Sequence, residues 1–126
     1  MYNLPKKLPT NMGPQFDLFY QNEDPWGSNY SIPELARRQI ILDFFLNSQF
    51  KNGLDIGCGE GHFTASMNFC KNMHGVDISS VAITRAKNYY KNQFFVGALP
   101  NLLNVKNDQY DFISCFEAIY YLSDLT

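Results

Sequence analysis

The sequence has few cysteines, few histidines, no excess of basic charge and no long apolar run. Its three cysteines, Cys58, Cys70 and Cys115, form no Cys-x-x-Cys pair, which argues against a disulfide framework and against a zinc site. The formal net charge is −2 and the basic residues are scattered, so we expect no nucleic-acid partner. Without an apolar run, neither a signal peptide nor a membrane span is expected. These absences favour a reduced, cytoplasmic protein with no metal site.

Apolar and aromatic side chains are what the sequence has in quantity, since 45% of the residues are hydrophobic and 16% aromatic. A chain of 126 residues can bury one core, because domains of about this size hide roughly two-thirds of their unfolded surface. Residues 1–15 hold three of the six prolines and show no hydrophobic period, so we predict a flexible arm there. Residues 16–126 are predicted to form a single domain.

The central feature is a glycine-rich stretch, Lys51-Asn-Gly-Leu-Asp-Ile-Gly-Cys-Gly-Glu-Gly-His-Phe63. A short apolar run ends near Asp55, three glycines follow at alternate positions, and a helix-compatible segment begins after them. This succession of strand, glycine turn and helix is typical of the first unit of a doubly wound α/β sheet, whose ligands bind beyond the carboxyl ends of the strands. Glycine suits such a turn because it adopts backbone angles closed to other residues and lets a ligand lie against the main chain.

The spacing of the glycines distinguishes between ligands. A dinucleotide fold requires Gly-x-Gly-x-x-Gly, but His62 stands at the position of that third glycine, and no phosphate-binding Gly-Lys-Ser/Thr follows. The motif Asp-x-Gly-x-Gly-x-Gly instead suits a nucleoside ligand without phosphates. A second apolar run, residues 73–77, ends in Asp77. An acid about 20 residues after the glycine turn is placed to accept both hydroxyls of a ribose.

The remaining elements follow from capping and periodicity. Ser31-Ile-Pro-Glu34 is a capping box that opens a helix to about Ser48. The predicted apolar face of that helix consists of Ile32, Leu35, Ala36, Ile40, Ile41, Phe44 and Phe45. A short helix with Phe63, Met67 and Cys70 on one face follows the glycine turn, and a helix capped by Ser79 runs to about Tyr90. Further strands are predicted over residues 93–96 and 110–115, so the fold class is α/β with a parallel sheet.

Several motifs together resemble one family. Asp-Pro-Trp at 24–26, Leu-Asp-Ile-Gly-Cys-Gly-Glu-Gly at 54–61, Val-Asp-Ile-Ser at 76–79 and Tyr-Tyr-Leu-Ser-Asp at 120–124 resemble class I S-adenosylmethionine-dependent methyltransferases, and among them the nodulation protein S-like subgroup. The resemblance covers residues 16–124. It implies a Rossmann-like sheet with strand order 3-2-1-4-5-7-6, of which this sequence supplies 3-2-1-4. We therefore expect the N-terminal part of such a domain, truncated before its later strands.

The resemblance also implies S-adenosylmethionine as the cofactor and assigns its contacts. Gly57, Cys58 and Gly59 would offer backbone contacts to the methionine part, Asp77 would hold the ribose, and Ile78 would pack on the adenine. Trp26 and either Arg37 or Arg38 would close the site. The predicted cofactor site further includes Asp55 and Cys115, near the ends of the first and fourth strands, and Ala98 and Leu99 in the turn after the third strand. Ala98 stands where relatives carry an acid, so one side-chain acceptor for the adenine amino group is absent.

Two of these assignments have simpler alternatives. Trp26 and the aromatic residues around it could staple the N-terminal arm to the sheet, or Trp26 could be a lid that covers a bound nucleoside and excludes water. Arg37 and Arg38 could be a solvated basic pair, or one of them could hold the cofactor carboxylate with two hydrogen bonds.

The implied reaction is transfer of a methyl group to a small-molecule acceptor, for which we favour an amine nitrogen. Alignment of the nucleophile, carbon and sulfur supplies most of the rate enhancement, because positioning can lower the activation free energy by up to roughly 7–11 kcal/mol. The catalytic candidates are Glu117 and Tyr120, which follow the fourth strand and could accept the amine proton. Each has a structural alternative: Glu117 as a helix-start acid and Tyr120 as a core aromatic.

Two other functions remain open. One is a cofactor-binding but catalytically incomplete module that needs a partner chain, and the other is a nucleotide-binding Rossmann domain of the dehydrogenase type. The strand predicted at residues 111–115 is apolar like an interior strand but would form the sheet edge. Such an edge exposes unpaired backbone groups, so we expect self-association or a partner chain through this strand.

Overall fold

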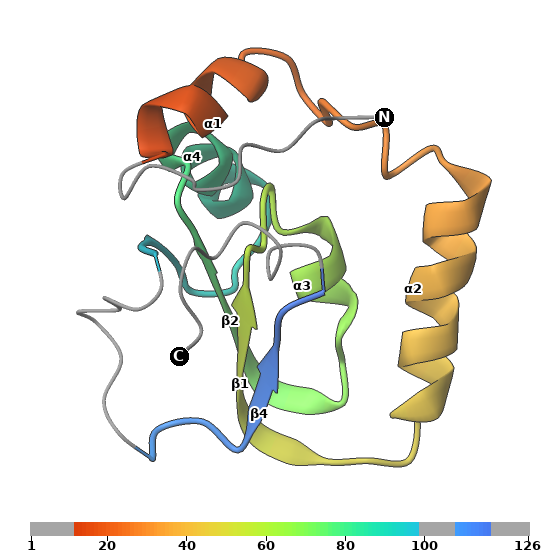
Figure 1. Cartoon of the computed structure of the whole chain (residues 1–126). Coiled ribbons are helices and arrows are strands. Elements are labelled where there is room, and N and C mark those ends of the chain that lie inside the picture. Colours follow the sequence, from red (N-terminus) through yellow and green to blue (C-terminus); the bar gives the residue numbers. More distant parts are fainter. Residues whose placement is uncertain (1–11, 99–107, 117–126) are drawn as a thin grey trace, which may run out of the picture.

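The computed structural model describes residues 12–98 and 108–116 and has a four-stranded parallel sheet at its centre (Figure 1). The strands are β1 (Phe50–Ile56), β2 (Cys70–Asp77), β3 (Phe94–Val96) and β4 (Phe112–Ser114). Their order across the sheet is β3-β2-β1-β4. The predicted α/β fold class and the predicted order 3-2-1-4 are therefore confirmed.

Four helices accompany the sheet: α1 (Gly13–Phe19), α2 (Ile32–Phe44), α3 (His62–Ser66) and α4 (Ser80–Tyr89). The two predicted caps are present, because the Ser31 hydroxyl accepts from the Glu34 N–H and the Ser79 hydroxyl accepts from the Ala82 N–H. Helix α2 ends at Phe44, short of the predicted Ser48. None of the helices among the described residues is both long enough and apolar enough to cross a membrane.

Strand β2 is longer than the sequence predicted. It begins at Cys70, which pairs with Phe50 of β1, and the Phe50 N–H donates to the Phe69 carbonyl oxygen at 2.8 Å. The prediction that Cys70 lies on a helix was therefore wrong. Helix α3 ends at Ser66 instead, and from Cys70 onward the backbone groups are satisfied by pairing with β1.

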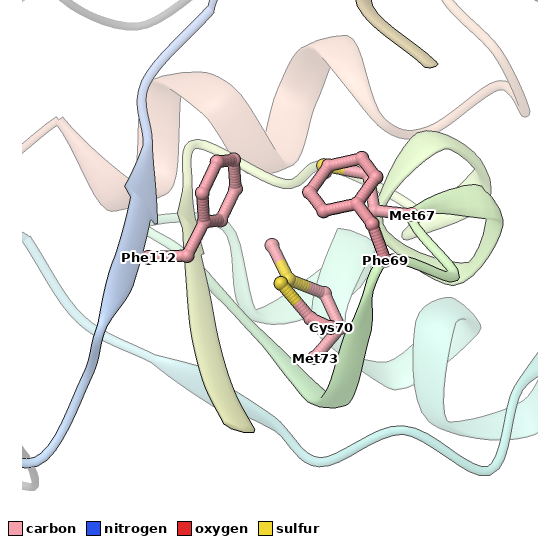
Figure 2. Packing of buried hydrophobic residues seen from close by; sticks show 5 residues of the cluster. All are labelled: Met67, Phe69, Cys70, Met73 and Phe112. Carbon is pink, nitrogen blue, oxygen red and sulfur yellow. The ribbon is translucent and has the colours of Figure 1, made fainter. Parts of the chain in front are cut away.

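The main core lies on the face of the sheet shown in Figure 2. Its buried members are Met67, Phe69, Cys70, Met73 and Phe112, and partly buried side chains from α2, β1 and α3 pack against them. Phe45, just after α2, lies with its ring centroid 4.9 Å from that of Phe69 and 5.2 Å from that of Phe112. This aromatic cluster holds the end of α2 against the strands.

Helix α2 presents a different face to the protein from the one predicted. Ile32, Ile40 and Phe44 are 81%, 69% and 79% exposed, whereas Leu42 and Phe45 pack on the core. The predicted apolar face was therefore wrong for Ile32, Ile40 and Phe44 and confirmed for Phe45. The helix carries apolar side chains on two sides. Phe50 of β1, Phe69 just before β2 and Phe112 of β4 select the side with Leu42, because it can join their cluster.

Candidate functional site

The glycine turn connects the carboxyl end of β1 to α3. Gly57, Gly59 and Gly61 have φ angles of +76°, +55° and +83°, which L side chains rarely adopt. The N–H groups of Gly57 and Cys58 both donate to the Val76 carbonyl oxygen, at 2.8 and 3.0 Å. These bonds tie the turn to the end of β2. A Cβ at Gly59 would meet the Tyr20 hydroxyl and one at Gly61 the Phe94 ring, so these two glycines allow close packing within the protein.

Asp77 ends β2 directly beside this turn. Its carboxylate accepts from the Gly59 N–H and from the Ser79 N–H, both at 2.9 Å, and the residue is only 8% exposed. Burial raises the pKa of Asp77, while its backbone donors oppose that shift. The Gly97 N–H donates to the Asp77 carbonyl oxygen at 2.9 Å, which brings the turn with Ala98 to the same sheet edge. Two donors leave lone pairs on this carboxylate for further hydroxyl groups.

Asp55 lies inside the protein. Its carboxylate accepts from the Thr64 hydroxyl at 2.7 Å and from the Ser114 hydroxyl at 2.8 Å, so it links β1 to α3 and β4. Burial raises its pKa from 3.8 to about 6, against the effect of the two hydroxyl donors. Asp55 therefore supports the site from inside the protein, by holding β1, α3 and β4 together.

The raised pKa of Asp55 predicts a pH-dependent stability. Between pH about 4 and about 6 the unfolded chain releases this proton while the folded chain retains it, so the free energy of unfolding falls as the pH rises. A shift of this size corresponds to roughly 3 kcal/mol at most. We expect the Asp55→Asn variant to lack this loss, so that its stability relative to wild type improves from pH 4 to pH 7. Urea unfolding of both proteins at several pH values measures the difference, and a difference independent of pH would contradict the assignment.

The N-terminal segment (residues 13–30) comprises α1 and the turns that follow it, and it lies next to the site. The Trp26 ring is 5.4 Å from the Tyr20 ring and 5.8 Å from the Phe19 ring, between centroids. Trp26 remains 50% exposed, whereas Tyr20 is 7% exposed. The Tyr20 hydroxyl lies against Gly59, at 2.7 Å from where a Cβ of that residue would be. An aromatic cluster therefore stands directly over the glycine turn.

Asp17 fastens this segment to the start of α4, beside which α1 lies in Figure 1. Its carboxylate accepts from the hydroxyls of Ser79 and Ser80, at 2.6 and 3.1 Å, and from the Val81 N–H at 3.2 Å. These donors lower the pKa of Asp17 against the opposing effect of desolvation. An anion at a helix N-terminus also interacts favourably with the helix dipole. The N-terminal segment is thus anchored from Ser79 onward, directly after the ribose-binding candidate Asp77 and its neighbour Ile78.

The two arginines have partners within the protein. Arg37 forms an ion pair with Glu34 at 2.9 Å. Arg38 donates from Nη1 to the Asn29 side-chain oxygen at 2.9 Å and from Nη2 to the Ser28 hydroxyl at 3.1 Å, and its guanidinium lies 5.6 Å from the Phe63 ring centroid. The Nε of Arg38 is buried without a hydrogen-bond partner among the described residues. The Nε of Arg37 is buried as well, so both arginines stay candidates for an anionic group.

The structure unites most of the predicted cofactor residues at the carboxyl edge of the sheet. Half-buried Ile78 follows Asp77, half-buried Ala98 follows β3, and half-buried Cys115 follows β4. Leu99 and the catalytic candidates Glu117 and Tyr120 lie outside the described residues and stay predictions. Within residues 12–98 and 108–116 no group of three histidine, cysteine or acidic side chains is arranged to hold a metal ion.

Sequence reasoning assigned no role to Asp17 and Glu60, which shape the site, and counted Tyr20 only among the aromatic residues that could staple the N-terminal arm. Glu60 stands inside the glycine motif, 6% exposed, but its partners come from residues 24 and 85. Asp17 caps a helix that begins more than 60 residues later in the sequence. The aromatic composition of residues 15–30 was the only local signal for Tyr20.

Comparison with known proteins gives this arrangement a family. Residues 30–126 match the family described as "Methyltransferase domain". The chain belongs to this methyltransferase family. No curated protein matches it.

Solved structures agree with the family. The N-methyltransferase NodS from Bradyrhizobium japonicum WM9, in complex with S-adenosyl-L-homocysteine, is 29% identical with a TM-score of 0.71, and the match covers 90% of this chain and 60% of NodS. A further NodS structure is 31% identical with a TM-score of 0.55, covering 72% of this chain and 53% of that one. A complex between the Haloferax volcanii Trm112 methyltransferase activator and a methyltransferase is 20% identical (TM-score 0.62; 87% and 50% covered) and shows the fold alone. This chain spans about 60% of the length of the NodS structure that it matches.

Proposed function

We propose that this chain binds S-adenosylmethionine and takes part in methyl transfer to a small-molecule amine. The observation that carries the proposal is the buried Asp77 carboxylate beside a turn of three glycines with positive φ. The family match and the S-adenosyl-L-homocysteine bound to NodS support the cofactor. The amine acceptor rests on the NodS description as an N-methyltransferase.

The residues present suit this cofactor. Asp77 would accept the ribose hydroxyls with its remaining lone pairs, and the turn at Gly57 and Gly59 would face the methionine part with backbone alone. Ile78 and Ala98 would flank the adenine with apolar groups. Arg37 or Arg38 would meet the carboxylate, for which a buried Nε is a further donor.

When bound, the cofactor supplies an electrophilic methyl group on a sulfonium. The protein's part is then to orient the acceptor in line, exclude water and accept the proton that the amine releases. The aromatic rings of Tyr20 and Trp26 would exclude water above the glycine turn. For the proton we propose Glu117 or Tyr120, as the sequence predicts.

Transfer of an isotope-labelled methyl group from S-adenosylmethionine to a panel of small amines and alcohols tests this function. We expect labelled amine products. Labelled alcohol products alone would overturn the amine acceptor, and the absence of any labelled product, with the cofactor bound, would favour the module that requires a partner chain.

The partner-chain alternative is favoured by the edge of the sheet. Strand β4 pairs with β1 and with no other strand among the described residues, and Ile113 on β4 is 60% exposed. We propose that this edge pairs with a second copy of the chain. Light scattering is then expected to give a mass above that of the 14.5 kDa monomer at micromolar concentration. The Ile113→Lys variant should shift the mass toward the monomer, and a monomeric wild type that turns over repeatedly would contradict the proposal.

Trp26 provides an optical test of the lid hypothesis. It is the single tryptophan of the chain and is half exposed. A bound nucleoside under the aromatic cluster would change its surroundings, so we expect its fluorescence intensity and emission maximum to shift on titration with S-adenosyl-L-homocysteine. If calorimetry shows binding while the fluorescence stays constant, Trp26 is a staple of the N-terminal segment and not a lid.

A further inference from the structure

Glu60 is a buried acid for which the proposed methyl-transfer chemistry has no use. It stands between Gly59 and Gly61 in the glycine turn and is 6% exposed. A carboxylate removed from water at this depth requires hydrogen-bond partners, so the identity of those partners shows what it holds in place.

Both oxygens of Glu60 are directed to the N-terminal segment or to what supports it. Oε1 accepts from the Asp24 N–H at 2.7 Å. Oε2 accepts from Nη1 of Arg85 on α4 at 3.2 Å, and the same nitrogen donates to the Asn22 carbonyl oxygen at 3.2 Å. The glycine turn is therefore connected to the N-terminal segment directly and through an arginine. Charge-assisted hydrogen bonds of this kind are stronger than neutral ones.

The stretch that Glu60 contacts, the Asp24–Asn29 unit, is held together by its own hydrogen bonds. Asp24 has a φ of +44°, and its carboxylate accepts from the N–H groups of Ser28 and Asn29 at 2.9 and 3.0 Å. Trp26 lies inside this unit, so its position depends on the hydrogen bond that holds the Asp24 N–H.

The far side of the same unit contacts helix α2. The side chains of Ser28 and Asn29 accept from Arg38, one of the two candidate arginines for the cofactor carboxylate. Glu60 thus stands at one end of a connected series that runs from the glycine turn through the Asp24–Asn29 unit to this candidate arginine.

We propose that Glu60 is a positioning residue: it docks the Asp24–Asn29 unit on the glycine turn and thereby sets the affinity for the cofactor without touching it. The effect on affinity rests on the proposed function, whereas the docking itself does not. Removal of Glu60 releases Trp26 and Tyr20 from above the turn and loosens the partners of Arg38.

Three variants test this positioning role, with acrylamide quenching of Trp26 measured in the unliganded chain. In Glu60→Ala both oxygens are lost, and quenching is expected to rise toward that of free tryptophan. Glu60→Gln keeps an acceptor for the Asp24 N–H but not the ion pair, so a smaller rise is expected. Glu23→Gln is the matched control, because the Glu23 carboxylate in the same segment accepts from the Tyr89 hydroxyl at 2.6 Å at the surface and should leave quenching unchanged.

Calorimetry with S-adenosyl-L-homocysteine gives the second readout. We expect about tenfold weaker binding in Glu60→Ala, an intermediate loss in Glu60→Gln and wild-type affinity in Glu23→Gln. Unchanged quenching in both Glu60 variants, with the far-UV circular dichroism of the wild type retained, would overturn the proposal. Should Glu60→Ala not fold, Glu60→Gln and Arg85→Met carry the test. A wild type that binds no S-adenosyl-L-homocysteine would refute the proposed function, while the quenching experiment would still decide the docking.

Discussion

Replacing Gly57 with valine is expected to abolish cofactor binding. Gly57 has a φ of +76°, and a β-branched residue forced into that region is strained by roughly 1–3 kcal/mol. A side chain would also enter the space beside the main chain in which the methionine part of the cofactor is proposed to lie. Together these effects predict a loss of at least about 100-fold in affinity, measured by calorimetry with S-adenosyl-L-homocysteine.

Gly27→Ala is the matched control for backbone strain. Gly27 also has a positive φ, of +65°, but a Cβ at this position would meet no atom within 4 Å. This variant should be destabilised by about 1 kcal/mol and, although Gly27 lies in the Asp24–Asn29 unit, should weaken cofactor binding far less than Gly57→Val does. If Gly57→Val binds as wild type does, the glycine turn is not the cofactor site. If Gly27→Ala loses binding equally, strain alone explains the loss.

Replacing Asp77 with asparagine is expected to weaken cofactor binding by about 10- to 100-fold. The change removes the charge and replaces one of the two acceptor oxygens proposed for the ribose hydroxyls with an NH2 donor, and hydrogen bonds to a charged group contribute about 1.5–3 kcal/mol. Asparagine is preferable to alanine, because Asp77 also accepts from the N–H groups of Gly59 and Ser79. Alanine would leave both buried donors unpaired and would cost stability as well as affinity.

Asp111→Asn is the matched control for Asp77→Asn. The Asp111 carboxylate also accepts from two N–H groups, those of Lys51 and Asn52 at 2.9 and 2.8 Å, but at the opposite end of the sheet. Its pKa is lowered by these donors, so the variant should lose some stability above pH 4 yet keep its affinity. Equal affinity of Asp77→Asn and wild type would remove Asp77 from the site.

The sequence predicted the sheet and the place of the site because their signals are local. Alternating glycines after an apolar run indicate the turn between the first strand and its helix. An acid at the end of the next apolar run indicates the ribose side of the ligand site. Each signal lies within a few residues and depends on backbone conformation. The position of Asp77 beside the glycine turn followed from them, whereas the strand order was implied by the family resemblance.

What the sequence could not predict depends on contacts between distant segments. Nothing near Glu60 indicates that its partners are Asp24 and Arg85, and nothing near Asp17 indicates that it caps α4. The rotation of α2 was mispredicted for the same reason. Both sides of that helix are apolar, and only the position of the phenylalanine cluster around Phe45 decides which side is buried.

The measurement that tests the central claim most directly is calorimetric titration of the wild-type chain with S-adenosyl-L-homocysteine and, separately, with NAD. The glycine spacing and the buried Asp77 beside the turn predict saturable binding of S-adenosyl-L-homocysteine and no binding of NAD. Binding of NAD with no response to S-adenosyl-L-homocysteine would contradict the account and assign the turn to a dinucleotide.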